Sequence, residues 1–132
     1  MKTRILQQLL GLTALLLIIS CSKNDTVPNN TNVIEGKWSG GYSFIGGPVH
    51  FFILNFKLGG AFSVDSSLTA ANSLATGTWI TGADSARATY TYSDGSGTYS
   101  LAGKYSADFK NMNGTIGNGT NTAGAWVFSV TK

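Results

Sequence analysis

Few side chains in this sequence have the types and spacing that covalent or acid–base chemistry requires. The chain contains one cysteine, Cys21, and one histidine, His50. A nucleophile needs a base within hydrogen-bonding reach, but no Ser or Cys motif and no paired carboxylate accompanies His50, which we interpret as an ordinary strand-end residue. The six acidic residues occur singly, and neither metal-ligand spacing nor a phosphate-binding glycine loop is present. We therefore expect a protein that is not an enzyme and that uses no cofactor or metal.

Cys21 stands where an apolar run gives way to polar residues. Lys2 and Arg4 precede a nearly unbroken apolar stretch over residues 9–19, which is the layout of a secretory signal peptide. The stretch is shorter than the roughly 20 apolar residues that a transmembrane helix needs. A single cysteine also excludes a disulfide within the chain. We expect residues 1–20 to be a signal peptide.

Residues 18–21, Ile-Ile-Ser-Cys, resemble the lipobox of bacterial lipoproteins. The resemblance implies cleavage before Cys21 and a diacylglyceryl group on its thiol. The protein would then be held on a membrane by its lipid, because two or three acyl chains anchor a protein where one does not. The Cys-Ser-Lys-Asn-Asp start is similar to the N-termini of Bacteroidota lipoproteins, which implies a location at the outer membrane or cell surface.

The segment after the cysteine, residues 21–33, is polar and predicts a flexible tether. It contains Pro28 and four asparagines and has almost nothing to bury. About 12 residues reach on the order of 40 Å when fully extended. The folded part could therefore stand clear of a lipid surface.

The charge balance of the exported part is nearly neutral. The whole chain has nine Lys and Arg against six Asp and Glu, and two of the nine, Lys2 and Arg4, lie in the signal peptide. Seven basic residues then face six acidic ones. Because nucleic-acid binding requires a basic stripe or patch, we expect no nucleic-acid partner.

Residues 34–132 have the alternation of apolar and polar side chains that is typical of β-strands, and they predict one domain. The residues that this alternation places on inner faces are Ile34, Gly36, Trp38, Gly40, Tyr42, Phe44, Phe52, Leu54, Phe56, Leu58, Phe62, Val64, Tyr90, Tyr92, Tyr99, Leu101, Gly103, Tyr105, Ala107, Phe109, Trp126, Phe128 and Val130. Val49, Phe51 and Ile53 make one half-strand apolar on both faces, so we expect it to contact other residues on each side.

Turn signals divide this domain into about eight or nine short strands. Residues 46–48, 59–60 and 94–95 are rich in glycine, which tolerates the backbone conformations of tight turns. Residues 66–75 predict a long loop or one helical turn. Residues 97–109 predict either one strand bent at Gly103 or two strands. Residues 113–120 predict a turn-rich return. The pattern favours an all-β fold, a small antiparallel up-and-down barrel of about eight strands, with a β-sandwich as the alternative.

The first strand opens with Gly36-Lys37-Trp38, followed by Gly40 and Tyr42, and resembles the Gly-x-Trp opening of lipocalins and lipocalin-like bacterial lipoproteins. Similar triplets end at Trp79 and Trp126. The resemblance implies a barrel that one tryptophan plugs at its closing end. Lipocalins pack a basic residue from the last strand over that tryptophan, and here the end of the chain offers only Lys132.

Five tyrosines share the predicted interior with the tryptophans, and buried hydroxyls need hydrogen-bond partners. The candidate ligand-binding residues are Trp38, Tyr42, Tyr90, Tyr92, Tyr99 and Tyr105. They could line a pocket for a small apolar or amphipathic molecule. Alternatively they fill the core, because an eight-stranded barrel is only just wide enough to be filled by side chains. The first interpretation predicts a ligand-binding protein, and the second predicts a structural or inhibitory envelope protein that contacts another protein through its loops.

Overall fold

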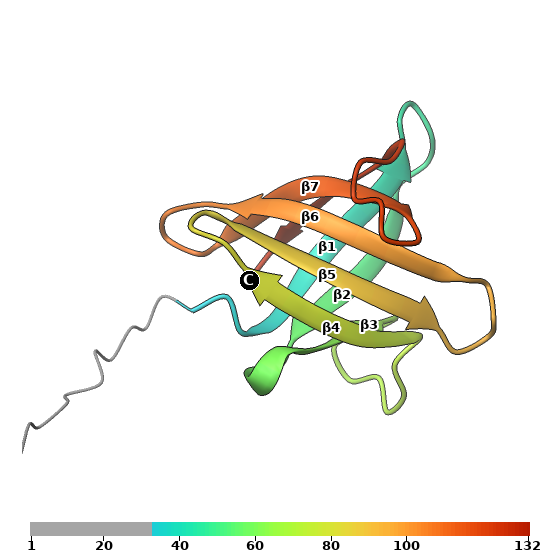
Figure 1. Cartoon of the computed structure of the whole chain (residues 1–132), viewed down its shortest axis with the longest axis horizontal. Helices are drawn as coiled ribbons and strands as arrows, with labels where there is room; N and C mark the ends of the chain where they lie inside the picture. The colour runs from blue at the N-terminus through green and yellow to red at the C-terminus, as the bar shows by residue number, and fades with distance from the viewer. Residues whose placement is uncertain (1–32) are drawn as a thin grey trace, which may run out of the picture. The chain divides into compact units, whose positions relative to one another are not determined.

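The computed structural model describes residues 33–132, which form an all-β, closed, eight-stranded antiparallel barrel (Figure 1). The strands are β1 (Gly36–Phe44), β2 (His50–Phe56), β3 (Ala61–Asp65), β4 (Ala75–Thr81), β5 (Ser85–Tyr92), β6 (Thr98–Tyr105), β7 (Asn111–Asn118) and β8 (Trp126–Thr131), and one short 3-10 turn, η1 (Leu58–Gly60), joins β2 to β3. Each strand pairs with its neighbour in sequence, and β1 pairs with β8 to close the ring. The closed ring excludes the β-sandwich alternative.

The predicted alternation of faces fills the barrel interior. The side chains that are fully or almost fully buried include Trp38, Leu54, Phe56, Phe62, Val64, Tyr90, Leu101, Met112, Phe128 and Val130. Each residue on the inner parity of a strand meets inner residues of its neighbours, because Cα partners in antiparallel strands point to the same face. Burial of this apolar surface is the main contribution to the stability of the barrel.

Glycines on the inner face allow the strands to bend into a small ring. Gly103 on β6 is paired with Gly114 on β7, and the ring of Phe128 on β8 lies over both. A Cβ atom on Gly114 would lie 2.0 Å from the carbonyl oxygen of Ala102, closer than non-bonded atoms can approach. The ring of Phe128 therefore occupies space that side chains at positions 103 and 114 would otherwise fill.

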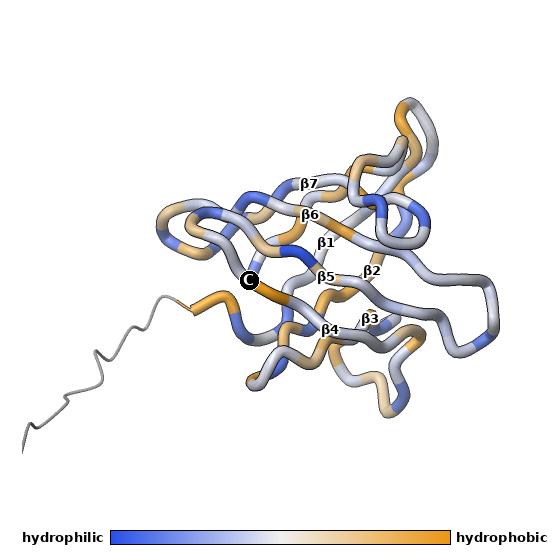
Figure 2. The backbone as a smooth tube through the Cα atoms, viewed as in Figure 1, coloured by the Kyte–Doolittle hydropathy of each residue, from blue (hydrophilic) through white to orange (hydrophobic). Residues whose placement is uncertain are grey.

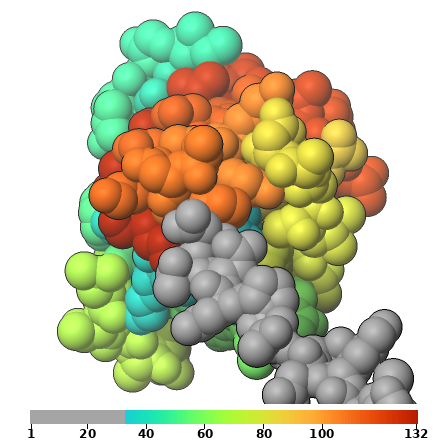
Figure 3. Space-filling model, turned by 90° about the vertical axis from the view of Figure 1, so that its left-hand side faces the viewer, coloured from blue at the N-terminus to red at the C-terminus, as the bar shows by residue number. Residues whose placement is uncertain are grey.

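The up-and-down order gives the barrel two different ends. At one end, which we call the base, lie residues 33 and 132 and the loops 57–60, 82–84 and 106–110. At the other end, which we call the mouth, lie the loops 45–49, 66–74, 93–97 and 119–125. Figure 3 looks onto the base, with the loop between β6 and β7 in orange near its centre.

Trp38 and Trp79 fill the interior at the base. The indole N–H of Trp38 donates to the carbonyl oxygen of Ile34 at 2.7 Å, and the indole N–H of Trp79 donates to the carbonyl oxygen of Lys57 at 2.9 Å. The ammonium of Lys132 lies 5.8 Å from the centroid of the Trp38 ring and donates to the carbonyl oxygen of Val33. The last residue of the chain thus places a cation against the tryptophan of the first strand.

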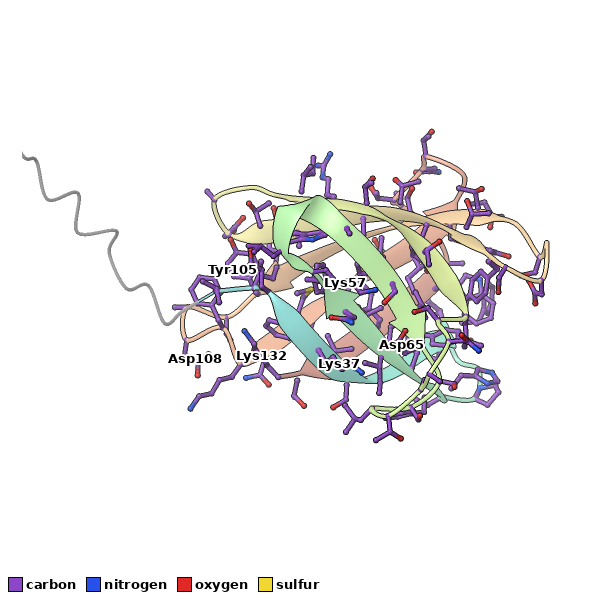
Figure 4. All side chains as sticks on the ribbon, turned by 90° about the horizontal axis from the view of Figure 1, so that it is seen from below. Lys37, Lys57, Asp65, Tyr105, Asp108 and Lys132 are labelled. Atoms are coloured by element: carbon purple, nitrogen blue, oxygen red, sulfur yellow. The ribbon has the colours of Figure 1, made fainter. Side chains whose placement is uncertain are left out.

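The outer face of β1 to β3 carries a buried polar group. Asp65 is 4% exposed, and its carboxylate lies 3.8 Å from the ammonium of Lys37, as Figure 4 shows on the outside of the barrel. The same ammonium donates to the carbonyl oxygen of Leu68 at 2.6 Å, which holds the 66–74 loop against the strands. Ile53, which the sequence placed on the second apolar face of β2, is fully buried beside this cluster.

Several local predictions differ from the structure. Leu58 is exposed rather than inward, because β2 ends at Phe56 and Leu58 begins the 3-10 turn. The 66–75 segment forms the predicted loop up to the start of β4, without the helical turn that was its alternative. Residues 113–120 are mostly strand rather than turn, since their small residues lie within β7.

Other differences lie at strand ends. Phe44, predicted to face inward, is half exposed at the end of β1. Val49 and Phe51 are exposed, so only Ile53 of the two-faced half-strand is covered on the outer side. β6 is a single strand that contains Gly103 and ends at Tyr105, and Phe109 lies in the following turn with φ of 55°.

The predicted signal peptide, residues 1–20, and Cys21 lie outside the described residues, as does the tether except for Val33. Among residues 33–132, no helix has the length and hydrophobicity to cross a membrane.

Candidate ligand-binding site

The interior opens at the mouth into a cavity of about 480 Å³. Its lining consists of Tyr42, Phe52, Tyr90, Tyr92, Asp94, Ser96, Tyr99, Ile116, Asn118 and Trp126. Six strands (β1, β2, β5, β6, β7 and β8) and the loop between β5 and β6 contribute these residues. The volume falls within the range of about 300 to 1,000 Å³ that small-molecule sites occupy.

Two aromatic groups form opposite walls of this cavity. On β5 and β6, Tyr90, Tyr92 and Tyr99 pack together, with ring centroids 5.6 to 6.2 Å apart. On β1 and β8, the centroids of Tyr42 and Trp126 lie 5.7 Å apart. The two groups oppose each other because β1 and β5 are half a turn apart in a ring of eight strands.

The tyrosine hydroxyls of this cavity make few contacts with other protein groups. Tyr99 donates to the carbonyl oxygen of Ser96 at a long 3.4 Å. Within residues 33–132, the hydroxyls of Tyr42, Tyr90 and Tyr92 have no protein hydrogen-bond partner, although Tyr90 is only 2% exposed. These groups therefore remain available to a molecule that enters the cavity.

Burial raises the pKa of Tyr90 well above its ordinary value, and the neighbouring Tyr92, Tyr42 and Tyr99 raise it further. Burial also raises the pKa of Tyr92, to about 12, with smaller contributions from Tyr42, Tyr99 and Asp94. The charged phenolate is disfavoured in a poorly solvated site that already contains other acidic groups. Both phenols are therefore neutral at physiological pH.

Asp94 is the charged residue of the rim. Its carboxylate accepts a hydrogen bond from the backbone N–H of Ser96 at 2.9 Å in the turn between β5 and β6. Hydrogen bonds from Ser96 lower the pKa of Asp94 below its ordinary value. The cavity lining thus carries one negative charge and no Lys, Arg or His side chain.

The candidate residues from the sequence divide between the two ends. Tyr42, Tyr90, Tyr92 and Tyr99 line the cavity. Trp38 is fully buried at the base, outside the cavity lining. Tyr105 also lies at the base (Figure 4). Its ring stacks on Phe109 with centroids 4.8 Å apart, and its hydroxyl donates to the carbonyl oxygen of Gly82.

His50 lies at the rim without lining the cavity. Its ring is 5.5 Å from that of Tyr42, and the side chain is exposed. Within residues 33–132, no group of three or more His, Cys, Asp or Glu side chains is close enough to hold a metal ion.

Sequence reasoning missed several lining residues. Trp126 and Phe52 were predicted to face inward without a role in binding. Asp94 was predicted only as part of a turn, and Ser96, Ile116 and Asn118 were given no role in binding. A signal for Asp94 was available, since a two-stranded hairpin places its turn beside Tyr92 and Tyr99. Asn118 has the inner parity of β7 and ends that strand at the mouth.

Comparison of the chain with protein-family models, curated proteins and solved structures found no match.

Proposed function

We propose that this chain is a lipid-anchored cell-envelope protein whose lipocalin-like barrel binds a small amphipathic molecule at its mouth, without catalysis. The observation that carries the binding proposal is the aromatic cavity with three phenol groups that have no hydrogen-bond partner among residues 33–132. Tryptophan at the base under a terminal lysine supports the likeness to lipocalins. Lipidation at Cys21 rests on the lipobox-like residues 18–21, and an outer-membrane or cell-surface location follows from it.

The position of the cavity suits an anchored binding protein. The chain enters the barrel at the base, and the cavity opens at the opposite end. An anchor attached through residues 21–33 therefore joins the barrel at the end away from the cavity. A ligand could enter the mouth without passing the point of attachment.

A thermal-shift panel of amphipathic compounds tests the binding proposal on residues 31–132, which belong to one compact unit. A ligand at 100 times its Kd adds about 2.7 kcal/mol to the free energy of unfolding. In a domain of this size, that amount raises Tm by roughly 10 °C or more. We expect at least one compound to produce such a shift.

Two variants of β7 locate the site. Asn118→Trp places a bulky ring at the rim of the cavity and should abolish the shift, whereas Asn113→Trp, exposed on the outer face of the same strand, should preserve it. No shift with any compound, or equal shifts in both variants, would overturn the binding proposal.

A second candidate function is contact with another envelope protein. Ile45 and Val49 in the β1–β2 hairpin, with Phe44, Phe51 and Val127 beside them, are exposed apolar residues. Figure 2 shows orange segments in this hairpin, which projects beyond the strands around it. Contiguous exposed apolar residues of this kind favour a protein interface.

A further inference from the structure

The charge and ring geometry of the mouth restrict which small molecule it can hold. This inference rests on the proposed binding function and concerns the chemical class of the ligand. The cavity lining combines six aromatic side chains with one carboxylate, that of Asp94, and includes no basic side chain.

The basic residues of the described chain lie elsewhere. Lys57, Lys110 and Lys132 belong to the base loops and the chain end, and Lys104 pairs with Asp84 at 3.2 Å. Lys37 is bound to Asp65 on the outer face of the barrel, and Arg87 is exposed on the outer parity of β5. A carboxylate or phosphate ligand would therefore find no cation in the cavity lining and would face the charge of Asp94.

The aromatic walls favour a cationic ligand over an anionic one. The face of a tyrosine or tryptophan ring carries partial negative charge, which attracts a cation within about 6 Å of the ring centroid. Tyr92 and Tyr99 meet nearly perpendicularly, at 88°, and Tyr42 and Trp126 meet at 50°. Rings inclined in this way on two opposite walls present several faces or edges to one small volume.

The rim adds a fixed negative charge to this volume. Asp94 is held by its hydrogen bond with Ser96, in the turn that connects Tyr92 to Tyr99. The cavity of about 480 Å³ has room for an apolar body as well as a charged head. Apolar contact with Phe52 and Ile116 deeper in the lining suits such a body.

We propose that the mouth binds an organic ammonium ion, with its cationic head between the β5–β6 tyrosines and the Tyr42–Trp126 pair and its apolar part toward Phe52 and Ile116. Attraction to ring faces accounts for most of the selectivity, and Asp94 contributes a smaller part because it is exposed to solvent. Fatty acids and other anionic amphiphiles are excluded by charge.

The test compares three probes with the same apolar chain but different heads: octyltrimethylammonium, octanoate and octyl glucoside. Calorimetric titration of residues 31–132 below the micellar concentrations should show the ammonium binding about tenfold or more tighter than the other two. Equal or tighter binding of octanoate or octyl glucoside would overturn the ammonium proposal while leaving the binding function intact. Failure of all three probes to bind would overturn both.

Three variants separate ring faces from hydroxyls and from charge. Tyr92→Phe keeps the ring and should change ammonium affinity less than twofold, whereas Tyr92→Leu should weaken it by about threefold or more. Asp94→Asn should weaken ammonium binding by about two- to fivefold at low salt and leave octyl glucoside unchanged, with a smaller effect at high salt.

Tyr105→Leu is the matched control, because it removes an aromatic ring at the base rather than at the mouth. Its ammonium affinity should equal that of the unmodified barrel. Equal losses in Tyr92→Leu and Tyr105→Leu would place the effect in folding rather than in the mouth and would contradict the proposal.

Discussion

Tyr90 and Tyr92 connect the chemistry of single residues to the stability of the barrel. Tyr90 is 2% exposed and Tyr92 lies half-buried beside it, with ring centroids 5.9 Å apart. Burial withdraws both phenols partly from water, which disfavours ionisation in the folded state. The same environment that keeps these phenols neutral makes the stability of the fold sensitive to alkaline pH.

We predict that the barrel loses stability as pH rises above 10.0, the ordinary pKa of tyrosine, toward the value of about 12 for Tyr92. In this window the unfolded chain releases phenolic protons that the folded chain retains, so stability falls with increasing pH. Below the window, the contribution of the neutral phenol is fully present. Urea unfolding measured across this range should show the decline.

Tyr92→Phe and Tyr90→Phe remove the titrating groups and should make the alkaline decline shallower. Near neutral pH the phenols are protonated in both the folded and the unfolded state. The slope of the unfolding free energy against pH should therefore be the same there in the variants and in the unmodified protein, which serves as the internal control. An alkaline decline with unchanged steepness in both variants would contradict this prediction.

At the scale of the strands, paired glycines set how tightly the sheet can curl. Gly103 and Gly114 face each other across β6 and β7, and Phe128 occupies the space above them. A Cβ atom on Gly103 would meet the side chains of Phe128 and Met112, and one on Gly114 would meet the backbone of β6 as well as the Phe128 ring. The bend of the strands and the position of Phe128 are thus parts of one packing arrangement.

Gly114→Ala should lower the free energy of unfolding by about 1–3 kcal/mol, because its Cβ would lie 2.0 Å from the carbonyl oxygen of Ala102 and 2.7 Å from the Phe128 ring. The expected readout is a lower urea midpoint with an unchanged slope. Gly82→Ala is the control, since its Cβ would meet the flexible hydroxyl of Ser85 at 3.1 Å and the Ser85 carbonyl oxygen at an ordinary 3.8 Å. Equal midpoints for the two variants would show that β7 adjusts without cost.

At the scale of the whole molecule, the proposed function divides anchoring and ligand binding between the two ends of the barrel. The base holds the tryptophans and receives the chain from its N-terminal side, and the mouth holds the cavity. A lipid on Cys21 would act at the base side through the tether of residues 21–33. Anchoring and ligand binding can then proceed independently.

We predict that the full chain, produced in a Gram-negative host, incorporates labelled palmitate and that Cys21→Ser abolishes the label. The reason is that the thiol of Cys21 is the only group in the chain that can form the thioether to diacylglycerol. Ser22→Ala, the neighbouring change, should keep the label. Unlabelled protein whose processing is insensitive to globomycin would contradict the lipoprotein proposal.

Local alternation predicted much of the fold. Trp38, Leu54 and Phe128 were placed inward correctly, because the two-residue period of a strand fixes the face of each side chain. The strand ends were less predictable. Leu58 continues the apolar period of β2 but lies in a turn, and small polar residues resembled a turn in β7, where pairing with β6 and β8 makes them strand.

The sequence alone determined the all-β class, the inner and outer faces of most strands and the scarcity of groups for catalysis. Only the tertiary structure decided that Tyr42, Tyr92 and Tyr99 share a cavity while Tyr105 lies at the opposite end. The face of the sheet on which a side chain lies depends on its position within one strand, and this is a local property. Height along the barrel depends on strand direction and on the stagger between paired strands, and these are set by the closure of β1 on β8.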